Sequence, residues 1–283
     1  MMKKWCCILL IGFLLSGCSS KFAYNNMDWL VYWYLDDYVE LNDSQEDIFD
    51  EHLKDWIQWH KSEELERYIQ HLETVREDIR NKSMSEERVL WHLQQAREHW
   101  QRMREELSPQ LAKFAERLSD EQVVSLFAAL EEDNKEEEEE LQEYREMSAD
   151  ERAEERLDDI RDDLEDRIGD LTDEQEQIIQ AHSPLFMSTR ADWIEYRRNI
   201  QQSARRLFVT RGSNEKFASD LLSLMVNPDA YRSEAYRTNR KANMKNYASL
   251  ASKIAGTFTD EQRNKLLDEV DDFISDLRDM QSD

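Results

Sequence analysis

The sequence predicts an all-α protein built from long amphipathic helices in two related helical-hairpin or bundle units. Five glycines and three prolines in 283 residues leave little material for the turns of a β protein. Apolar residues recur at three- and four-residue spacings over most of the chain, which is the spacing of a helix that buries one face. The same helix-start pattern also occurs in both halves of the chain.

The composition of the whole chain narrows the class of function. A net charge of -26 argues against nucleic-acid binding, because a polyphosphate needs a basic footprint. The sequence contains no nucleophile elbow, phosphate-binding glycine loop or HExxH motif, so we expect neither an enzyme nor a cofactor. Beyond the N-terminal region, no apolar run approaches the roughly 18 residues of a membrane span.

Residues 1–17 have the pattern of a signal peptide, since two lysines precede an apolar run over residues 5–15. The run ends in Leu-Ser-Gly-Cys at 15–18, which resembles the lipobox of bacterial lipoproteins. The resemblance implies that Cys18 is acylated and anchors the mature chain to a membrane; the alternative is a signal sequence with an incidental cysteine. Two serines follow the cysteine, which in Gram-negative lipoproteins favours the periplasmic face of the outer membrane. The other two cysteines lie in the removed segment, so no disulfide is expected.

Residues 18–40 are predicted to be the lipid anchor and an aromatic N-terminal segment. A helix from Tyr24 to Tyr38 is apolar on nearly every side, so it either packs into the core or contacts the bilayer interface, and we expect core packing. This block resembles the opening of an uncharacterised family of Gram-negative lipoproteins, catalogued as a domain of unknown function. The resemblance implies a location and no activity.

Four predicted helix starts share one capping pattern. A capping residue is followed three positions later by glutamine, whose side chain can reach back to the backbone N–H of the cap. An apolar residue follows each cap by seven positions, so the four helices bury the same face. The simplest interpretation is a protein with well-capped helices. The four pairs are Asn42 and Gln45, Ser119 and Gln122, Thr172 and Gln175, and Thr259 and Gln262.

The first predicted unit spans residues 41–130. Its apolar spacing predicts one long amphipathic helix over 43–82 and a second over 86–107. A helix restart or kink is expected at Ser108-Pro109, where a cap is followed by proline at the first helical position. A further helix follows the cap at Ser119.

Residues 131–170 are predicted to form an acidic helical connector. They contain 21 Asp or Glu and 6 Lys or Arg, which are the features of a solvated spacer. The run at 136–140 is not expected to bind metal, because consecutive helical side chains point in different directions around the axis.

The second predicted unit spans residues 171–283 and repeats the first. The pattern Leu-x-Asp-x-Gln-Glu-x-Ile-x-x-x-His occurs at 41–52 and again at 171–182, and the cluster at 55–59 matches that at 192–196. The two offsets differ by seven residues, about two helical turns, so the buried stripe keeps its face. We interpret the halves as a duplication; chance similarity between helical sequences is the alternative.

A pair of boxes that brackets a helical hairpin is similar to the periplasmic family of Spy and CpxP, whose hallmark is a doubled Leu-Thr-x-x-Gln motif. Residues 240–244, 253–254 and 259–262 resemble the Spy branch at the same spacing, and the first half matches only through the repeat. The resemblance implies an all-helical, often dimeric cradle that holds unfolded clients without ATP, or a stress-sensing relative that binds metal or a sensor kinase. Those relatives are typically smaller, soluble, unduplicated and less acidic, and Ser119 and Asn42 replace threonine in two boxes.

Charge reverses in the second unit, where residues 185–255 contain 13 Lys or Arg and 6 Asp or Glu. Aromatic and arginine side chains suit adaptable contacts with unfolded envelope proteins. The alternatives are that the aromatic residues are simply core and that the arginines dock onto the acidic connector. The candidate client-binding residues are Trp193, Tyr196, Arg197, Arg198, Arg205, Phe208, Tyr236, Arg240, Met244 and Tyr247.

Histidines are the remaining candidates for chemistry. His52, His60 and His71 fall near one face of one predicted helix, and His92 and His99 lie two turns apart on the next. A zinc site between the helices is geometrically allowed. Because short ligand spacing is missing, we expect hydrogen-bonding histidines on or between helices and no bound metal.

A rival class of function is a structural or signalling lipoprotein with one fixed partner in the envelope. A strongly acidic segment beside a basic one should either fold back on itself or meet a complementary surface. The repeated boxes place the chaperone-like interpretation slightly ahead.

Overall fold

The computed structural model describes residues 24 and 26–282, and every regular element in that part of the chain is a helix. The all-α prediction is confirmed. The predicted signal peptide at 1–17 and the predicted lipidation site Cys18 lie outside the described residues. Within the described ranges, no helix is both long and apolar enough to cross a membrane.

The long helix predicted over 43–82 consists of three continuous elements. α4 (Asp43–Trp59) passes into a π-helical turn, η1 (His60–Glu64), which continues as α5 (Leu65–Arg80). Turns of this kind are rare inside α-helices and frequently lie at functional sites. Here the turn ends at Glu64, whose side chain is fully buried.

The aromatic N-terminal segment contains α3 (Met27–Leu35), which packs by one face only. Val31 and Tyr32 contact a core cluster on this face, whereas Trp29 and Trp33 are 60% and 43% exposed. The core packing expected for this segment therefore covers only part of it.

α6 (Glu86–Phe114) continues without a break through Pro109, so the restart predicted at Ser108-Pro109 is wrong. Proline removes one backbone hydrogen bond from a helix interior. Ser108 and Ala112 are buried beside it, and packing on this face keeps the chain helical. The helix is followed by η2 (Ala115–Arg117).

The second half of the chain begins inside one helix, because α7 (Asp120–Glu146) crosses the predicted boundary at 130. The acidic connector is helical, as predicted. The remaining elements are α8 (Ala149–Ile168), α9 (Asp173–His182), η3 (Ser183–Leu185), α10 (Arg190–Thr210), α11 (Phe217–Val226), η4 (Pro228–Tyr231), α12 (Glu234–Gly256) and α13 (Asp260–Ser282).

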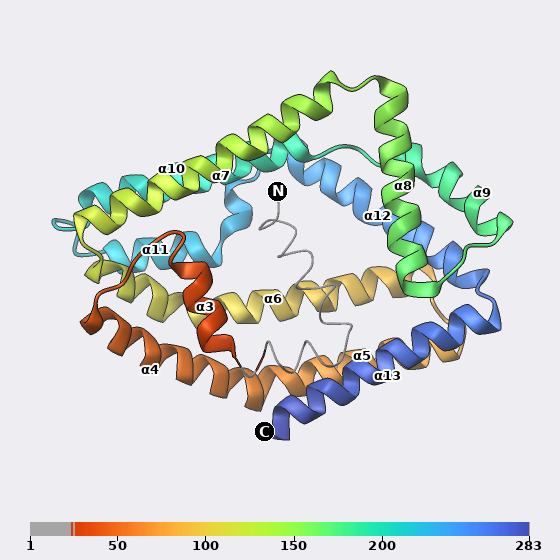
Figure 1. The fold of residues 1–283 in the computed structure, drawn as a ribbon, viewed down its shortest axis with the longest axis horizontal. Helices are drawn as coiled ribbons and strands as arrows, with labels where there is room; N and C mark the ends of the chain where they lie inside the picture. The colour runs from red at the N-terminus through yellow and green to blue at the C-terminus, as the bar shows by residue number, and fades with distance from the viewer. Residues whose placement is uncertain (1–23, 25, 283) are drawn as a thin grey trace.

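The most extensive helix contacts join the two halves of the chain. α13 lies along α5, α11 and α12 pack on α6, and α10 pairs with α7 (Figure 1). The helices consequently form a broad frame, with α4 and α5 along one side and α7 and α10 along the opposite side. The relation between 41–130 and 171–283 as two duplicated units stays a prediction.

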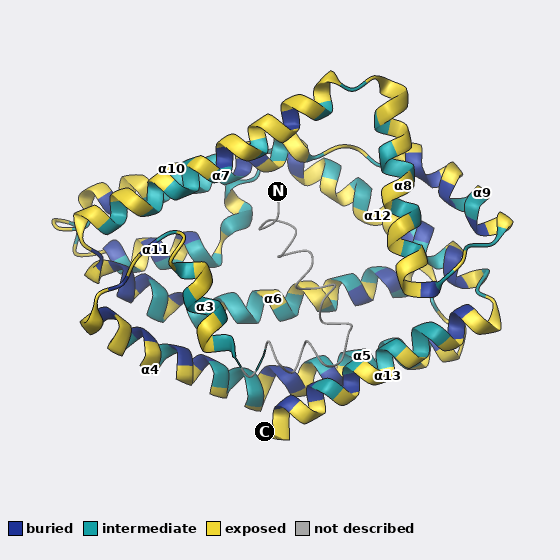
Figure 2. Ribbon diagram, in the orientation of Figure 1, coloured by how far each residue is buried: buried dark blue, intermediate teal, exposed yellow. Residues whose placement is uncertain are grey.

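Three groups of buried apolar side chains hold this frame together, and each combines helices that are distant in sequence. The largest contains Phe49 and Trp56 of α4, Phe114 of α6 and Phe208 of α10. A second joins α5 to α13, and a third joins α8 and α9 to α12. Buried residues accordingly lie on the faces that helices turn toward one another (Figure 2). The apolar stripes of these helices therefore pack against helices that are distant in sequence.

Candidate functional site

All four predicted capping boxes are formed, and their glutamines meet in pairs. Gln175 donates through Nε2 to Oε1 of Gln262 at 2.8 Å, and Gln262 returns the bond at 2.9 Å. Each Oε1 also accepts its own cap's backbone N–H, from Thr172 at 3.0 Å and Thr259 at 3.1 Å. The starts of α9 and α13 are thereby joined by side chains that are almost fully buried.

The first half contains the same arrangement. Gln45 donates to Oε1 of Gln122 at 3.0 Å and receives a bond from its Nε2 at 2.7 Å. The second N–H of each amide donates to the backbone carbonyl oxygen of Arg117 or Glu40, at 2.8 and 2.7 Å. Both donors and both lone pairs of each amide are thus used.

This pairing explains why glutamine occupies the third helical position in these four boxes. Glutamate there can accept from the cap N–H but cannot donate to a second box. The box at Ser148 shows the difference, because Glu151 accepts the cap N–H at 2.6 Å and makes no hydrogen bond to another box in the described residues. The sequence contained this signal, although the pairing itself was not predicted.

Three of the predicted client-binding residues are core. Tyr196, Phe208 and Tyr236 are at most 9% exposed. Tyr196 and Tyr236 lie with ring centroids 5.9 Å apart, and the guanidinium of Arg232 lies over both rings. Phe208 packs edge-on against Phe217. For these residues the structure agrees with the interpretation of the aromatics as core.

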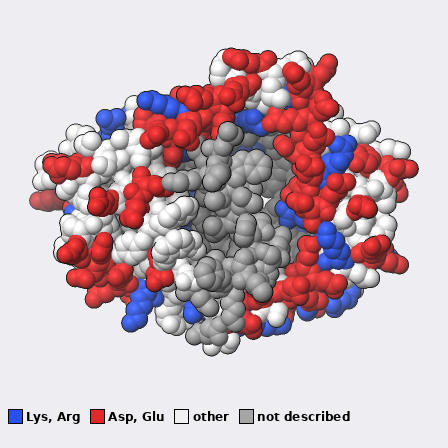
Figure 3. All heavy atoms as spheres, in the orientation of Figure 1, with Lys and Arg blue, Asp and Glu red and all other residues white. Residues whose placement is uncertain are grey.

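Two predicted client-binding arginines of α10 contact the acidic part of α7. Arg197 lies 3.0 Å from Glu137 and 3.4 Å from Asp133, and Arg198 lies 3.0 Å from Glu131. The docking of arginines onto the chain's own acids is therefore observed for this pair. Acidic side chains outnumber basic ones on the visible face of the molecule, including the part formed by α8 (Figure 3).

The other predicted client-binding residues are accessible. Arg205 is exposed, and Arg240 is exposed with its guanidinium near the ring of Tyr236. Trp193 is 38% exposed at the start of α10. Met244 and Tyr247 are 37% and 45% exposed on α12.

Four exposed apolar side chains lie where the segment before α10 crosses α12. Asn243 accepts from the backbone N–H of Met187 and donates to its carbonyl oxygen, at 2.9 and 2.7 Å. Asn246 donates to the carbonyl oxygen of Leu185 at 2.5 Å. These bonds fix the backbone of this segment against α12, while the side chains of Leu185 and Met187 stay exposed. We call the surface of Leu185, Met187, Met244 and Tyr247 the α12 face.

A second candidate site is a chain of three histidines between α5 and α6. His71 lies at the centre, with Nε2 3.1 Å from Nδ1 of His92 and Nδ1 3.3 Å from Nε2 of His99. We call His99, His71 and His92 the histidine chain. The prediction that histidines would form hydrogen bonds between helices is confirmed for these three.

Each end of the histidine chain reaches a carboxylate that is also bound by arginine. At one end, His92 Nε2 lies 3.0 Å from Asp78, which pairs with Arg88. At the other, His99 Nδ1 lies 3.4 Å from the buried Glu64, which accepts from Arg102. The order arginine, carboxylate, histidine is the same at both ends.

The surroundings of the histidine chain disfavour the protonated form of its imidazole rings. Burial, followed by the charges of His92, His99 and Arg88, lowers the pKa of His71 to about 4. Burial is also the main cause that lowers the pKa of His92 and of His99. Burial opposes ionisation of Asp78, but hydrogen bonds from Arg88, Ser83 and His92 outweigh it and lower its pKa.

The other histidines of the same region are not part of the histidine chain. His60 shares a 2.9 Å hydrogen bond with Tyr24, and His52 stacks on Trp56. No group of three or more His, Cys, Asp or Glu side chains among the described residues has the arrangement of a metal site.

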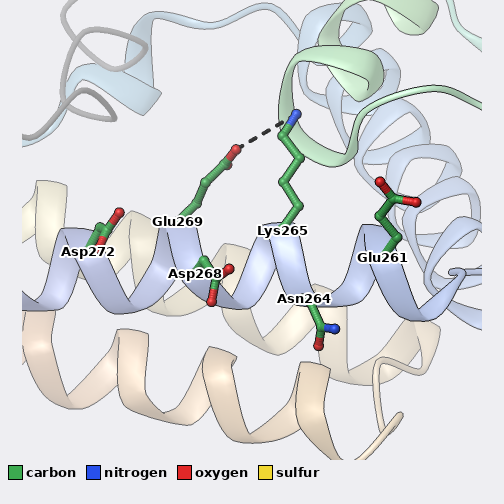
Figure 4. A pocket seen from close by; sticks show the side chains of 6 residues that line it. All are labelled: Glu261, Asn264, Lys265, Asp268, Glu269 and Asp272. Atoms are coloured by element: carbon green, nitrogen blue, oxygen red, sulfur yellow. Dashed lines mark ion pairs between the residues drawn. The ribbon is translucent and has the colours of Figure 1, made fainter.

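A surface pocket on α13 is acidic. It measures about 620 Å³, and its lining comes from one helix, with Lys265 reaching Glu269 at 4.0 Å (Figure 4). Because the other lining acids lie along a solvated helix, the pocket has the character of an ordinary charged face. Its lining residues are Glu261, Asn264, Lys265, Asp268, Glu269 and Asp272.

Comparison with known proteins gives one family and no activity. Residues 37–237 match a family of unknown function (DUF6279). No curated protein and no solved structure matches the chain.

Proposed function

The chain belongs to the family of unknown function DUF6279, and from this premise we propose that it is a lipid-anchored envelope protein that binds apolar segments of partly unfolded proteins without ATP. The observation that carries the proposal is the α12 face. Its four apolar side chains are 37–51% exposed, and the backbone beneath them is fixed by Asn243 and Asn246. Exposed apolar surface on a rigid support is typical of binding sites, because little ordering entropy is lost on contact.

The residues around the α12 face suit clients of varied sequence. Methionine is flexible and polarisable, so two exposed methionines can adapt to different apolar side chains. Arg240 is exposed one helical turn before Met244 and can meet acidic positions of a client. Both Met244 and Tyr247 belong to the set predicted from the sequence.

The lipid anchor is proposed from the sequence around Cys18, and the exposed side of α3 supports it. Trp29 and Trp33 stack with ring centroids 6.3 Å apart on that side. Tryptophan favours the interface between membrane and water. An aromatic face shortly after an acylated cysteine would lie close to the periplasmic surface of the outer membrane.

The paired glutamines support a common origin of the two box pairs. Gln45 with Gln122 and Gln175 with Gln262 make corresponding bonds, including those to the backbone carbonyl oxygens of Glu40 and Asp170. We therefore propose that the similarity to Spy and CpxP reflects a shared hairpin closure, duplicated in this chain. The rival role, a connector that reaches one fixed partner, has less support because acids of α7 already pair with Arg197 and Arg198.

The client-binding proposal is tested by the aggregation of a chemically denatured client, followed by light scattering. A chain that starts at residue 19 is expected to suppress scattering at stoichiometric amounts. A variant with Met187→Ser, Met244→Ser and Tyr247→Ser is expected to lose most of that effect. The matched control carries Val124→Ser and Val209→Ser, which replace apolar residues that are 70% and 80% exposed elsewhere. Failure of the unaltered chain to suppress scattering, or equal loss in the control, refutes the α12 face as the binding surface.

A further inference from the structure

The hydrogen bonds of the histidine chain define where its protons lie. Arg102 Nη2 contacts Nδ1 of His99, and a guanidinium can only donate, so this nitrogen accepts. The proton of neutral His99 is then on Nε2, and it points to Nδ1 of His71. In the same way Nε2–H of His71 points to His92, and Nε2–H of His92 points to Asp78. All three neutral rings donate one bond and accept one bond, in a single direction from Arg102 to Asp78.

One additional proton can also be accommodated with every ring nitrogen bonded. A solvent proton that binds Nδ1 of His99 makes a new N–H, which donates to Glu64 in place of accepting from Arg102. His99 then passes its Nε2 proton to Nδ1 of His71. His71 carries the positive charge and donates to both neighbours, while the outer rings donate to Glu64 and Asp78. The charge is thus centred between two carboxylates.

A second proton has no such arrangement. Any two neighbouring rings that are both charged would turn an N–H toward an N–H across 3.1 or 3.3 Å. They would also place two positive charges within the separation at which like charges strongly oppose ionisation. Interacting sites of this kind titrate as one unit and not as independent residues.

We propose that the histidine chain, with Glu64 and Asp78 at its ends, is a single-proton site at which the proton and Arg102 compete for Nδ1 of His99. The neutral state ties Arg102 of α6 to both His99 and Glu64. The charged state leaves Arg102 bound to Glu64 alone and adds a bond from His99 to Glu64. Proton uptake therefore changes the link between α6 and the π-helical turn that ends at Glu64.

The remaining charged groups near the histidine chain have partners of their own or lie at the ends of the histidine chain. Arg67 contacts Glu64 at 3.5 Å, and Glu98 acts electrostatically on His99. From the N-terminal segment, Tyr24 bonds to His60, whose ring lies against Tyr68, and the Tyr68 ring packs edge-on against His99 at 4.7 Å.

The helices packed against α5 and α6 contribute ion pairs that lie outside the histidine chain. Asp271 and Arg278 of α13 pair with Arg76 and Glu73 of α5, and Asp229 of η4 pairs with Arg97 of α6. Proton binding by the histidine chain is therefore governed mainly by four charged side chains, which are Glu64, Asp78, Arg88 and Arg102.

The proposal is tested by NMR of the full chain labelled with 15N-histidine, through long-range couplings between imidazole nitrogens and ring protons. At neutral pH, the three chain histidines are expected to be neutral with the proton on Nε2. On acidification they should change together, with one shared midpoint and the uptake of one proton. His52 and His182 serve as internal references. Three separate midpoints, or a proton on Nδ1 at neutral pH, would overturn the proposal.

Two variants test the competition directly. Arg102→Met removes the competitor and a positive charge, so the shared midpoint should rise by about one pH unit. Asp78→Asn removes a negative charge that stabilises the charged state and should lower the midpoint. Arg76→Met is the matched control, because Arg76 lies on α5 and pairs with Asp271 outside the chain. An unchanged midpoint in both chain variants, or an equal shift in the control, contradicts the proposed site.

Discussion

Gln175 and Gln262 are 87 positions apart in sequence and hold each other by two reciprocal hydrogen bonds of 2.8 and 2.9 Å in the buried interior. Each glutamine also completes the cap of its own helix. The amide group of each glutamine therefore caps its own helix and also bonds to the glutamine of the other helix. The result is a closed junction between α9 and α13.

Replacing one member of this pair should destabilise the protein strongly. Gln175→Ala removes a cap contact and leaves the buried amide of Gln262 partly unpaired, for an expected cost of about 2–4 kcal/mol. Gln122→Ala in the first half should cost less, because Gln122 is only half-buried. Urea unfolding followed by circular dichroism measures both. A double-mutant cycle with Gln262→Ala should give a coupling of about 1 kcal/mol or more, and strictly additive effects would contradict the reciprocal bonds.

Stability should fall on acidification because of His71. The pKa of His71 is lowered to about 4 in the folded chain, against 6.5 for an ordinary histidine, so the unfolded chain binds more protons between these values. Above pH 6.5 neutral His71 makes its full contribution to the free energy of unfolding, and this contribution is lost as the pH falls toward 4. Titrating carboxylates affect wild type and variant alike, so the measured quantity is the difference in unfolding free energy from His71→Gln.

Between pH 6.5 and 4 that difference should change by up to about 1.4 kcal/mol per pH unit, with the wild type losing relative stability. Urea unfolding at four pH values provides the measurement. His52→Gln, on the same helical rod but outside the histidine chain, is the control. A difference that stays constant with pH would show that the environment of His71 does not oppose its charge.

Membrane attachment should depend on a single side chain. Cys18→Ser removes the thiol that would be acylated, and with it the proposed lipid anchor. We expect the variant in the soluble periplasmic fraction and the wild type in the outer-membrane fraction. Cys7→Ser is the control, since Cys7 lies in the predicted signal peptide. Retention of the Cys18 variant in the membrane fraction refutes the anchor.

The two neighbouring arginines of α10 should differ in their contribution to stability. Arg197 is 18% exposed and contacts two acids of α7, so Arg197→Gln should destabilise by about 1–3 kcal/mol because it removes two partly buried ion pairs. Arg198 is 37% exposed, and Arg198→Gln should cost under about 1 kcal/mol and less still in high salt. Thermal unfolding in low and high salt separates the two. Equal effects would contradict the difference in burial.

The sequence by itself determined the helical class, the long rod over 43–82 and the four capping boxes. These features depend on contacts within about one helical turn, so the local order of residues is sufficient to specify them. The restart predicted at Pro109 shows where local rules fail. Burial of Ser108 and Ala112 against neighbouring helices outweighs one lost backbone bond.

Only the tertiary structure decided which side chains act together. The glutamines pair because α9 meets α13 and α4 meets α7, and the three histidines align because α6 lies antiparallel to α5. The sequence also could not separate core aromatics such as Tyr196 and Tyr236 from exposed residues such as Met244 and Tyr247, since both kinds recur at helical spacing. The physical reason is that periodicity specifies a buried stripe on each helix, whereas the partner of that stripe depends on how all helices pack.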